Sequence, residues 1–254
     1  MDKIQLSIII PAYKEGERIG GNLLKIKEYV ENKGLSYEIL VVVDGSPDNT
    51  AEVARGFSEQ IENLRVIDNE ENHGKGYVVR QGLLEATGEY RVFLDADGST
   101  AITHMDRALE LLNDGAEVVV GSRDIEGAYI QIHQPKHREI MGDMGNWLIR
   151  GVLGLWKYPD TQCGFKVLTA DSAEAIASRM VVDRFGFDFE LIILAEKMKF
   201  NVVQMPVRWL NEEGSTVGLT GPNGFIQVLI DLFKTRIRLW GGKYNINEKL
   251  KIKN

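Results

Sequence analysis

The chain is short of cysteine. Its 254 residues include a single one, Cys163, which excludes an internal disulfide and cannot by itself form a structural zinc site. No run of residues approaches the ~20 apolar positions that span a bilayer, and residues 1–7 lack the basic start and apolar stretch of a signal peptide. We therefore expect a protein of the reducing, cytoplasmic compartment.

Positive charge is scarce outside the carboxyl-terminal tail. The net charge is −7, but residues 234–254 hold seven Lys or Arg and one Glu and carry +6, which leaves −13 for the rest. An acidic body argues against nucleic acid as a partner, whereas the basic tail is compatible with an anionic membrane surface. The length and the 44% hydrophobic content suit one large α/β domain or two small ones.

Short, β-branched apolar runs alternate with helical stretches in the first half. Strands are expected at 6–10, 38–43, 64–67, 90–94 and 117–121, and helices at 17–32, 49–61, 75–86 and 103–113. This alternation predicts an α/β fold, with a mostly parallel, Rossmann-like sheet and helices on both faces. Further helices at 140–156 and 187–199 and a strand within 201–209 are expected in the second half.

Polar loops follow three of the expected strands. They span residues 11–17, 44–50 and 95–100. In parallel α/β sheets, ligands bind at the carboxyl ends of the strands. The three loops therefore outline a single site.

Asp95 and Asp97 lie one residue apart at the end of the apolar run "RVFL". Two carboxylates so placed repel each other unless a cation lies between them. Mg²⁺ or Mn²⁺ takes hard oxygen ligands and keeps positions for phosphate oxygens, so the pair fits a metal bound with a diphosphate. The alternative is that both residues only form a turn, since Asp and Gly favour turns.

Several motifs together resemble a known family. "IIIPAYKEGERI", "VVVDGSPDNT", "NHGKGYVVRQGL", "FLDADGST" and "VVVGSR" follow in the order and spacing of inverting glycosyltransferases of the GT-A fold. "DTQCGFKVLT", "RFGFDFELI" and "VRWLNEEGS" look more narrowly like the polyprenyl-phosphate sugar synthases, above all the dolichyl-phosphate β-glucosyltransferases. The resemblance covers most of the chain.

The resemblance implies a set of donor-binding residues. The positions that match the nucleotide-sugar contacts of the family are Pro11, Ala12, Tyr13, Glu15, Asp44, Lys75, Asp95 and Ser215, with Asp95 and Asp97 as metal ligands. Tyr13 can stack on a base, and Asp44 can accept hydrogen bonds from a pyrimidine. Lys75 and a helix that begins near Gly76 could meet phosphate, although Lys75 could equally be a solvated residue at a helix start.

Two positions depart from the family pattern. Val43 replaces the first of two adjacent aspartates, and Thr216 replaces a basic residue after Gly-Ser. Asp44, the base-reading position, is retained, so its assignment stands. The replacement at Thr216 puts in doubt the contact near Ser215 by which the family closes over the diphosphate or sugar.

Arg123 and Arg138 match the positions that the family uses for the acceptor phosphate. Arginine can hold phosphate oxygens with two parallel hydrogen bonds, although either residue could instead be a surface arginine. A lipid phosphate needs no general base, because with a second pKa of ~6 it is largely dianionic at pH 7. Asp97, Arg123 and Arg138 are thus the expected catalytic residues.

The spacing of apolar residues within 225–240 predicts a basic amphipathic helix. This helix could lie in a bilayer interface or pack on the domain. We divide the chain into a glycosyltransferase domain at 1–224, with a nucleotide-sugar half at 1–121 and an acceptor half at 122–224, and a membrane-interface segment at 225–254.

The expected function is metal-dependent transfer of glucose or N-acetylglucosamine from a UDP-sugar to a dolichyl or polyprenyl phosphate, with inversion, at the cytosolic face of a membrane. The alternatives are a saccharide acceptor, a sugar nucleotidyltransferase and a silent nucleotide-sugar-binding module. The nucleotidyltransferase is disfavoured because no glycine-rich basic loop follows the first strand.

Overall fold

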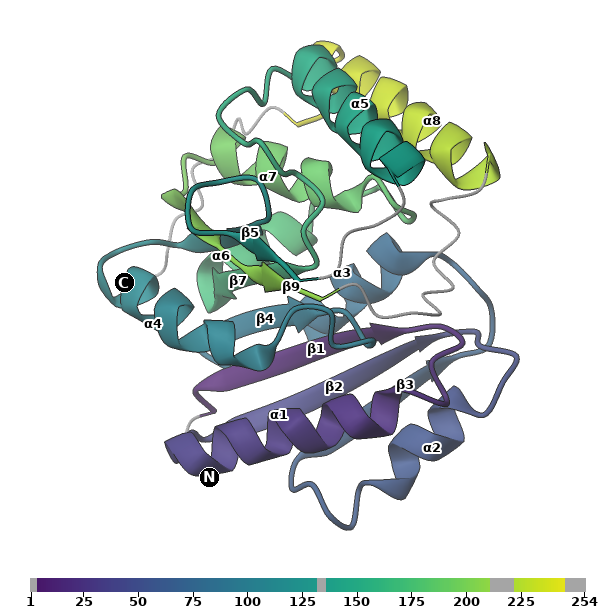
Figure 1. The fold of residues 1–254 in the computed structure, drawn as a ribbon, viewed down its shortest axis with the longest axis vertical. Coiled ribbons are helices and arrows are strands. Elements are labelled where there is room, and N and C mark those ends of the chain that lie inside the picture. Colours follow the sequence, from purple (N-terminus) through teal and green to yellow (C-terminus); the bar gives the residue numbers. More distant parts are fainter. Residues whose placement is uncertain (1–3, 132–135, 211–221, 245–254) are drawn as a thin grey trace.

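The computed structural model describes residues 4–131, 136–210 and 222–244, with side chains for 4–131, 142–210 and 226–244 (Figure 1). The strands are β1 (Leu6–Ala12), β2 (Tyr37–Asp44), β3 (Leu64–Asn69), β4 (Tyr90–Leu94), β5 (Val118–Ser122), β6 (Tyr129–Ile130), β7 (Phe165–Thr169), β8 (Val202–Pro206) and β9 (Arg208–Trp209). The helices are α1 (Ile19–Lys33), α2 (Thr50–Gly56), α3 (Lys75–Glu85), the 3₁₀ helix η1 (Ile102–His104), α4 (Met105–Asn113), α5 (Lys136–Leu153), α6 (Ala170–Ala177), α7 (Phe187–Lys197) and α8 (Pro222–Trp240).

A seven-stranded sheet forms the centre, in the order β3-β2-β1-β4-β7-β5-β8, and a two-stranded sheet pairs β6 with β9. Every pair in the large sheet is parallel except those of β7, which runs antiparallel to β4 and β5. The mostly parallel sheet predicted from the sequence is therefore confirmed.

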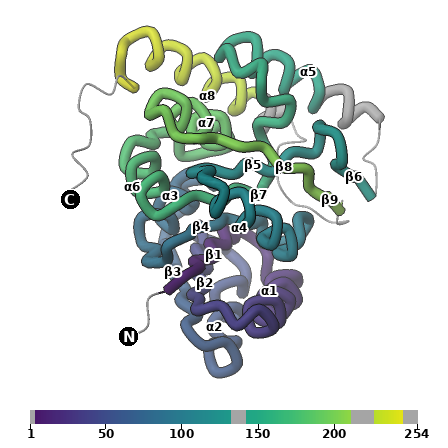
Figure 2. The backbone as a smooth tube through the Cα atoms, turned by 90° about the vertical axis from the view of Figure 1, so that its left-hand side faces the viewer, coloured from purple at the N-terminus to yellow at the C-terminus, as the bar shows by residue number. Residues whose placement is uncertain are grey.

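Helices cover both faces of this sheet, which is why its strands are apolar on both sides. In β1, Ile8 and Ile10 join the core beneath α1, α2 and α4, whereas Ile9 joins the core beneath α3, α6 and α7. Figure 2 shows α3 and α6 on the opposite side of the strands from α1. Burial on both faces fixes the strands, and so the positions of the loops at their ends.

The strand β7 and the helix α6 were not predicted from the sequence. β7 carries Lys166, which is fully buried at the middle of the sheet. Its Nζ donates hydrogen bonds to Asp188 Oδ1 at 2.5 Å and to the carbonyl oxygen of Cys163 at 2.7 Å. Lysine is almost never fully buried unless it is paired. Here the burial of Lys166 is tolerable because Asp188, a residue on another element, supplies the opposite charge.

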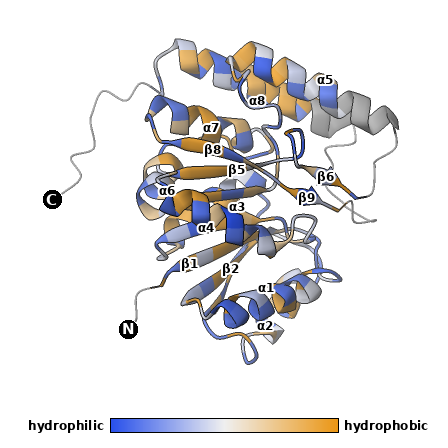
Figure 3. Ribbon diagram, turned by 60° about the vertical axis from the view of Figure 1, so that its left-hand side comes forward, coloured by the Kyte–Doolittle hydropathy of each residue, from blue (hydrophilic) through white to orange (hydrophobic). Residues whose placement is uncertain are grey.

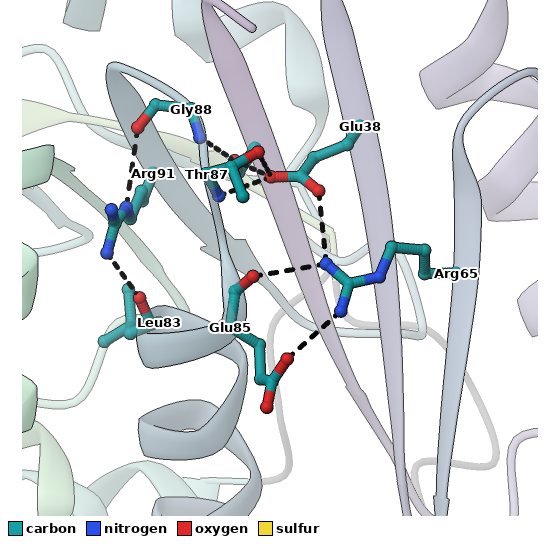
Figure 4. Close-up of polar contacts among 8 residues, drawn as sticks. Glu38, Arg65, Leu83, Glu85, Thr87, Gly88 and Arg91 are labelled. Carbon is teal, nitrogen blue, oxygen red and sulfur yellow. Dashed lines mark hydrogen bonds and ion pairs between the residues drawn. The ribbon is translucent and has the colours of Figure 1, made fainter.

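A polar cluster holds the sheet at its amino ends (Figure 4). Buried Glu38 accepts hydrogen bonds from the Ser7 hydroxyl at 2.6 Å and from Thr87 N at 2.6 Å, and it forms an ion pair with Arg65 at 3.5 Å. Burial alone would raise the pKa of Glu38, but the hydrogen bonds from Ser7 and Thr87 and the charge of Arg65 lower it overall. This cluster ties β1, β2 and β3 together at the end of the sheet away from the expected site.

The helix α8 lies beside α5 and closes the second half (Figure 1). Val228 and Leu232 are buried in the same core as α7, so the segment delimited at residues 225–254 begins inside a packed helix. Its division from the rest of the domain stays a prediction. None of the helices in the described ranges is long and apolar enough to cross a bilayer.

We predict that Asp188→Leu destabilises the protein by ~3–5 kcal/mol, because it leaves the ammonium of Lys166 buried without its counter-charge. The double variant Lys166→Met/Asp188→Leu should recover most of that loss, since no buried charge remains. Urea unfolding followed by circular dichroism measures both. Glu31→Ala, which removes an exposed ion pair with Lys27, is the control and should cost under ~1 kcal/mol. A single variant at position 188 as stable as the wild type would contradict the role of the pair.

Candidate functional site

A cavity of about 240 Å³ opens at the carboxyl ends of β1, β2 and β4. It brings together eight residues predicted from the sequence: Pro11, Ala12, Tyr13, Glu15, Asp44, Lys75, Asp95 and Asp97. It is also lined by residues that the sequence did not single out: Asn72, Gly74, Val78, Ala96, Arg184 and Phe185. The three polar loops therefore share one cavity, while the role of each residue in it stays a prediction.

The loop that carries Asp95 and Asp97 is held from both sides. Asp97 Oδ1 accepts a hydrogen bond from the backbone N–H of Ser99 at 2.9 Å, and Gly98 takes a positive φ of 71° that suits glycine in this tight turn. From α1, the amide of Asn22 donates to the carbonyl oxygens of Asp95 and Ala96 at 3.3 and 3.2 Å. The backbone of the loop is thus fixed before any ligand binds.

The carboxylate of Asp95 is enclosed by two residues. Lys75 Nζ donates to its Oδ1 at 2.5 Å. On the other side, a Cβ added to Gly164 would lie 2.0 Å from its Oδ2, so any larger residue there would displace the carboxylate from this position. Gly164, just before β7, is therefore a site residue that the sequence pattern did not reveal, because its contact is with a loop far away in the chain.

Lys75 remains charged in this position. Burial works to lower its pKa, but the nearby charges of Asp95 and Asp188 and the hydrogen bond to Asp95 raise it overall. Its ammonium also lies 5.9 Å from the ring centre of Phe187. The ammonium is thus paired with the carboxylate of Asp95 and is also stabilised by the charge of the buried Asp188 at the start of α7.

Three carboxylates lie close enough to affect one another. Burial, then the charge of Asp95, raises the pKa of Asp97. Burial also raises the pKa of Glu15 to about 7, against the opposing charge of Arg18 and with a contribution from Asp97. Glu15 Oε2 is buried and has an ion-pair contact with Arg18 at 2.8 Å, but accepts no hydrogen bond from the described residues.

This donor set fits a divalent cation. Carboxylate oxygens are the ligands that Mg²⁺ and Mn²⁺ prefer, and a bound cation would offset both the burial and the mutual repulsion that raise the pKa values of Asp97 and Glu15. Across the described ranges, no group of three or more His, Cys, Asp or Glu side chains forms a ready-made metal cage. Asp95 and Asp97 would therefore hold the ion together with oxygens of a ligand, as expected for a metal that arrives with a diphosphate.

Asp44 is held by the loop that precedes α3. Its Oδ1 accepts from His73 N at 2.8 Å and Gly74 N at 3.2 Å, and its Oδ2 accepts from Asn72 Nδ2 and Gly74 N, both at 2.9 Å. A base that hydrogen-bonds to this carboxylate has to compete with these donors. Its assignment as the base-reading residue stays a prediction.

Two N–H groups in the first turn of α3, those of Gly76 and Tyr77, are bonded within the protein, so they do not serve the phosphate contact expected of a helix that starts near Gly76. Gly76 N donates to the carbonyl oxygen of Arg184 at 3.2 Å, and Tyr77 N donates to that of Asp183 at 2.9 Å. The segment that provides these carbonyls was not foreseen as a neighbour of α3. The contact of this end of α3 with phosphate stays a prediction for Lys75.

Residues 180–186 form one wall of the cavity, which they line with Arg184 and Phe185. Buried Glu190 accepts hydrogen bonds from Val181 N and Val182 N at 3.1 and 2.9 Å. The hydroxyl of Tyr244, after α8, also donates to Glu190, at 2.5 Å. Glu190 thus ties the segment before α7 to the chain just beyond the carboxyl-terminal helix, which is a structural role.

The predicted acceptor residues are only partly within the described side chains. Arg123 binds Asp160 through Nε at 2.7 Å and Nη2 at 2.9 Å, and its guanidinium stacks near Trp209, 5.6 Å from the ring centre. Burial would lower the pKa of Arg123, but the charge of Asp160 more than offsets this. The side chain of Arg138 and the whole of Ser215 lie outside the described residues.

Comparison with known proteins places this site in a family. Residues 7–177 match the family described as Glycosyl transferase family 2. A dolichyl-phosphate beta-glucosyltransferase of Drosophila melanogaster is 35% identical over 96% of this chain and 78% of its own length. Another from Trichomonas vaginalis is 32% identical over 94% of this chain and 76% of its own.

Solved structures agree on the fold. Glucosyl-3-phosphoglycerate synthase of M. tuberculosis superposes with a TM-score of 0.66 at 15% identity, covering 91% of this chain and 80% of that one. The same enzyme in complex with Mn²⁺, UDP-glucose and phosphoglyceric acid has a TM-score of 0.60 at 15% identity, with the same coverage. The GT-A fold expected from the sequence motifs is confirmed.

We expect Glu15→Gln to gain stability relative to the wild type as the pH rises from 5 to 8. The raised pKa means that folded Glu15 keeps its proton up to about pH 7, whereas the unfolded chain releases it near pH 4.5, so the wild type loses stability across this window. The difference should reach about 1–3 kcal/mol, measured by urea unfolding in EDTA. Gly21→Ala, at a helical position with nothing within 4 Å of the added Cβ, should show a pH-independent difference. A pH-independent difference for Glu15→Gln would refute the raised pKa.

Proposed function

The chain belongs to glycosyltransferase family 2, and from this premise we propose that it transfers glucose from uridine diphosphate glucose to a dolichyl or related polyprenyl phosphate, with inversion. The observation that carries the proposal is the identity of 32–35% to proteins named dolichyl-phosphate beta-glucosyltransferase, over more than nine-tenths of this chain. Those names support glucose and give no support to N-acetylglucosamine.

The cavity suits a nucleotide diphosphate with a metal ion. The crystallised M. tuberculosis enzyme holds Mn²⁺ and UDP-glucose, which supports a metal and a uridine donor here at the level of the fold. We assign Asp95 and Asp97 to hold Mg²⁺ or Mn²⁺, which would act as a Lewis acid on the leaving diphosphate. Lys75 and Arg184, two cations that line the same cavity, would balance the remaining phosphate charge.

A phosphate acceptor fits the second half better than a sugar hydroxyl does. A hydroxyl nucleophile needs a general base, but Asp188 is paired with Lys166, and Glu190 is bound to two N–H groups and a tyrosine. A lipid phosphate needs cations that orient it. Arg123 keeps Nη1 outside its two contacts with Asp160, and we assign it, with Arg138, to the acceptor phosphate.

We place the enzyme at the cytosolic face of a membrane. The outer side of α8 exposes Ile226, Ile230, Phe233, Ile237 and Trp240, which recur at intervals of three and four residues. The neighbouring helix α5 exposes Met144 and Trp147, and Figure 3 shows hydrophobic residues along both helices. Lys234, Arg236 and Arg238 lie among the apolar positions of α8, an arrangement that suits an anionic bilayer surface.

To test the function, purified protein is incubated with UDP-glucose, UDP-N-acetylglucosamine or GDP-mannose, Mn²⁺ and a short polyprenyl phosphate. We expect glucosyl-phosphoryl-polyprenol as the product. Asp97→Asn should lower turnover at least ~100-fold with the fold intact, because an amide cannot supply the charge that holds the ion, and EDTA should do the same. Transfer only to saccharides, or full activity in EDTA, would overturn the proposal.

Membrane attachment has its own test. Phe233→Glu/Ile237→Glu should weaken binding to liposomes that contain anionic lipid by at least ~10-fold in co-sedimentation, because two exposed apolar side chains leave the bilayer interface. Leu24→Glu/Leu84→Glu makes the same charge change at exposed leucines elsewhere and should bind like the wild type. Equal losses in the two double variants would show that net charge alone is responsible. Wild-type protein that stays in the supernatant at low salt would exclude this role for α8.

A further inference from the structure

We propose that Lys75 is an internal counter-ion that occupies Asp95 until the donor arrives and then moves to the diphosphate, so that the divalent cation and the nucleotide bind cooperatively. The inference rests on the proposed function, since it takes the ligands to be a divalent cation and a nucleoside diphosphate. It assigns to Lys75 a role in the order of binding as well as in contact with phosphate.

Neither carboxylate oxygen of Asp95 is freely accessible to a metal ion. Oδ1 carries the ammonium of Lys75 at 2.5 Å, and Oδ2 faces the backbone at Gly164, where even a methyl group would lie 2.0 Å away. A metal ion binds a carboxylate oxygen at about 2.0–2.2 Å and needs a lone pair that points to it. Lys75 therefore occupies the direction from which a cation would approach Oδ1.

Charge repulsion adds to the steric exclusion of a metal ion from Asp95 by Lys75. An ammonium and a divalent cation at one carboxylate repel each other at short range in a partly buried cavity, where water screens them weakly. The side chains of Lys75 and Asp95 are only 24% and 25% exposed. A metal ion without a nucleotide must therefore break the ion pair before it binds, and Lys75 would then lose its partner.

Backbone hydrogen bonds fix the main chain around Lys75, whereas its flexible four-carbon side chain is held only at its ammonium. The next two residues donate their N–H groups to the carbonyls of Arg184 and Asp183, and Gly74 N donates to Asp44. The ammonium can thus change partner only by rotation of its four-carbon side chain within the cavity. A diphosphate in that cavity would offer it new anionic oxygens, because Lys75, Asp95 and Asp97 line the same space.

A divalent cation alone should bind weakly, because it displaces Lys75 from Asp95 without giving the ammonium a new partner. With a diphosphate present, the displaced ammonium gains a partner, so each ligand increases the affinity for the other by the same factor. The repulsion among Asp95, Asp97 and Glu15 is also kept in check before the donor binds.

The test is to measure Mn²⁺ binding with and without UDP. The electron paramagnetic resonance signal of free Mn²⁺ and calorimetry both report this binding. Lys75→Met should bind Mn²⁺ alone about tenfold more tightly than the wild type, because no ammonium competes for Asp95. UDP should increase the Mn²⁺ affinity of the wild type, but by a several-fold smaller factor in Lys75→Met. Lys75→Gln should behave as Lys75→Met does, and Lys75→Arg, which keeps the charge, as the wild type.

Arg184→Met is the matched control, because it removes a positive charge from the same cavity wall without touching Asp95. It should change the affinity for Mn²⁺ alone by less than about threefold. Equal affinities for Mn²⁺ alone in the wild type and in both neutral Lys75 variants, with folding verified by circular dichroism, would overturn the inference. If no variant binds Mn²⁺ even with UDP, the metal-dependent function fails instead.

Discussion

The buried ion pair between Lys166 and Asp188 holds the strand β7, in the interior of the sheet, against the helix α7. It allows β7 to run through the middle of the sheet, antiparallel to β4 and β5, although the strand carries a charged residue. Because β7 lies beside β4, the residues just before it contact residues of both proposed sides: Gly164 packs on Asp95, and Asp160 binds Arg123. The proposed donor side and the proposed acceptor side thus meet through one strand.

Much of the proposed donor side could be predicted from the sequence, because its determinants are local. Near-continuous apolar runs identify β1, β2 and β4, and parallel strands bring the polar loops after them to one edge. Asp95 and Asp97 were found in this way. The resemblance to glycosyltransferases then supplied roles that spacing alone does not.

The remaining contacts depend on residues distant in the chain. Gly164 reads as a loop glycine until the carboxylate beneath it is located, and Arg184 as a surface arginine until residues 180–186 are found against α3. The bonds of Gly76 N and Tyr77 N in α3 were missed for the same reason, since their acceptors lie more than a hundred residues away. Partners of Arg123 and Asp44 likewise emerge only when the chain is folded.

The helix α8 is hydrogen-bonded to the segment that carries Arg184 and Phe185, which line the cavity. Its Asp231 accepts a hydrogen bond from Gly186 N at 3.2 Å, and Tyr244, just beyond the helix, donates to Glu190, which in turn holds Val181 and Val182. The carboxyl-terminal helix is therefore not an interchangeable module. A chimera that exchanges it for the anchor of another enzyme would also replace two supports of the wall that carries Arg184. Substitutions that adapt the surface proposed to face the lipid are therefore confined to the outer side of α8. The inner side of the helix must continue to fit the cavity wall.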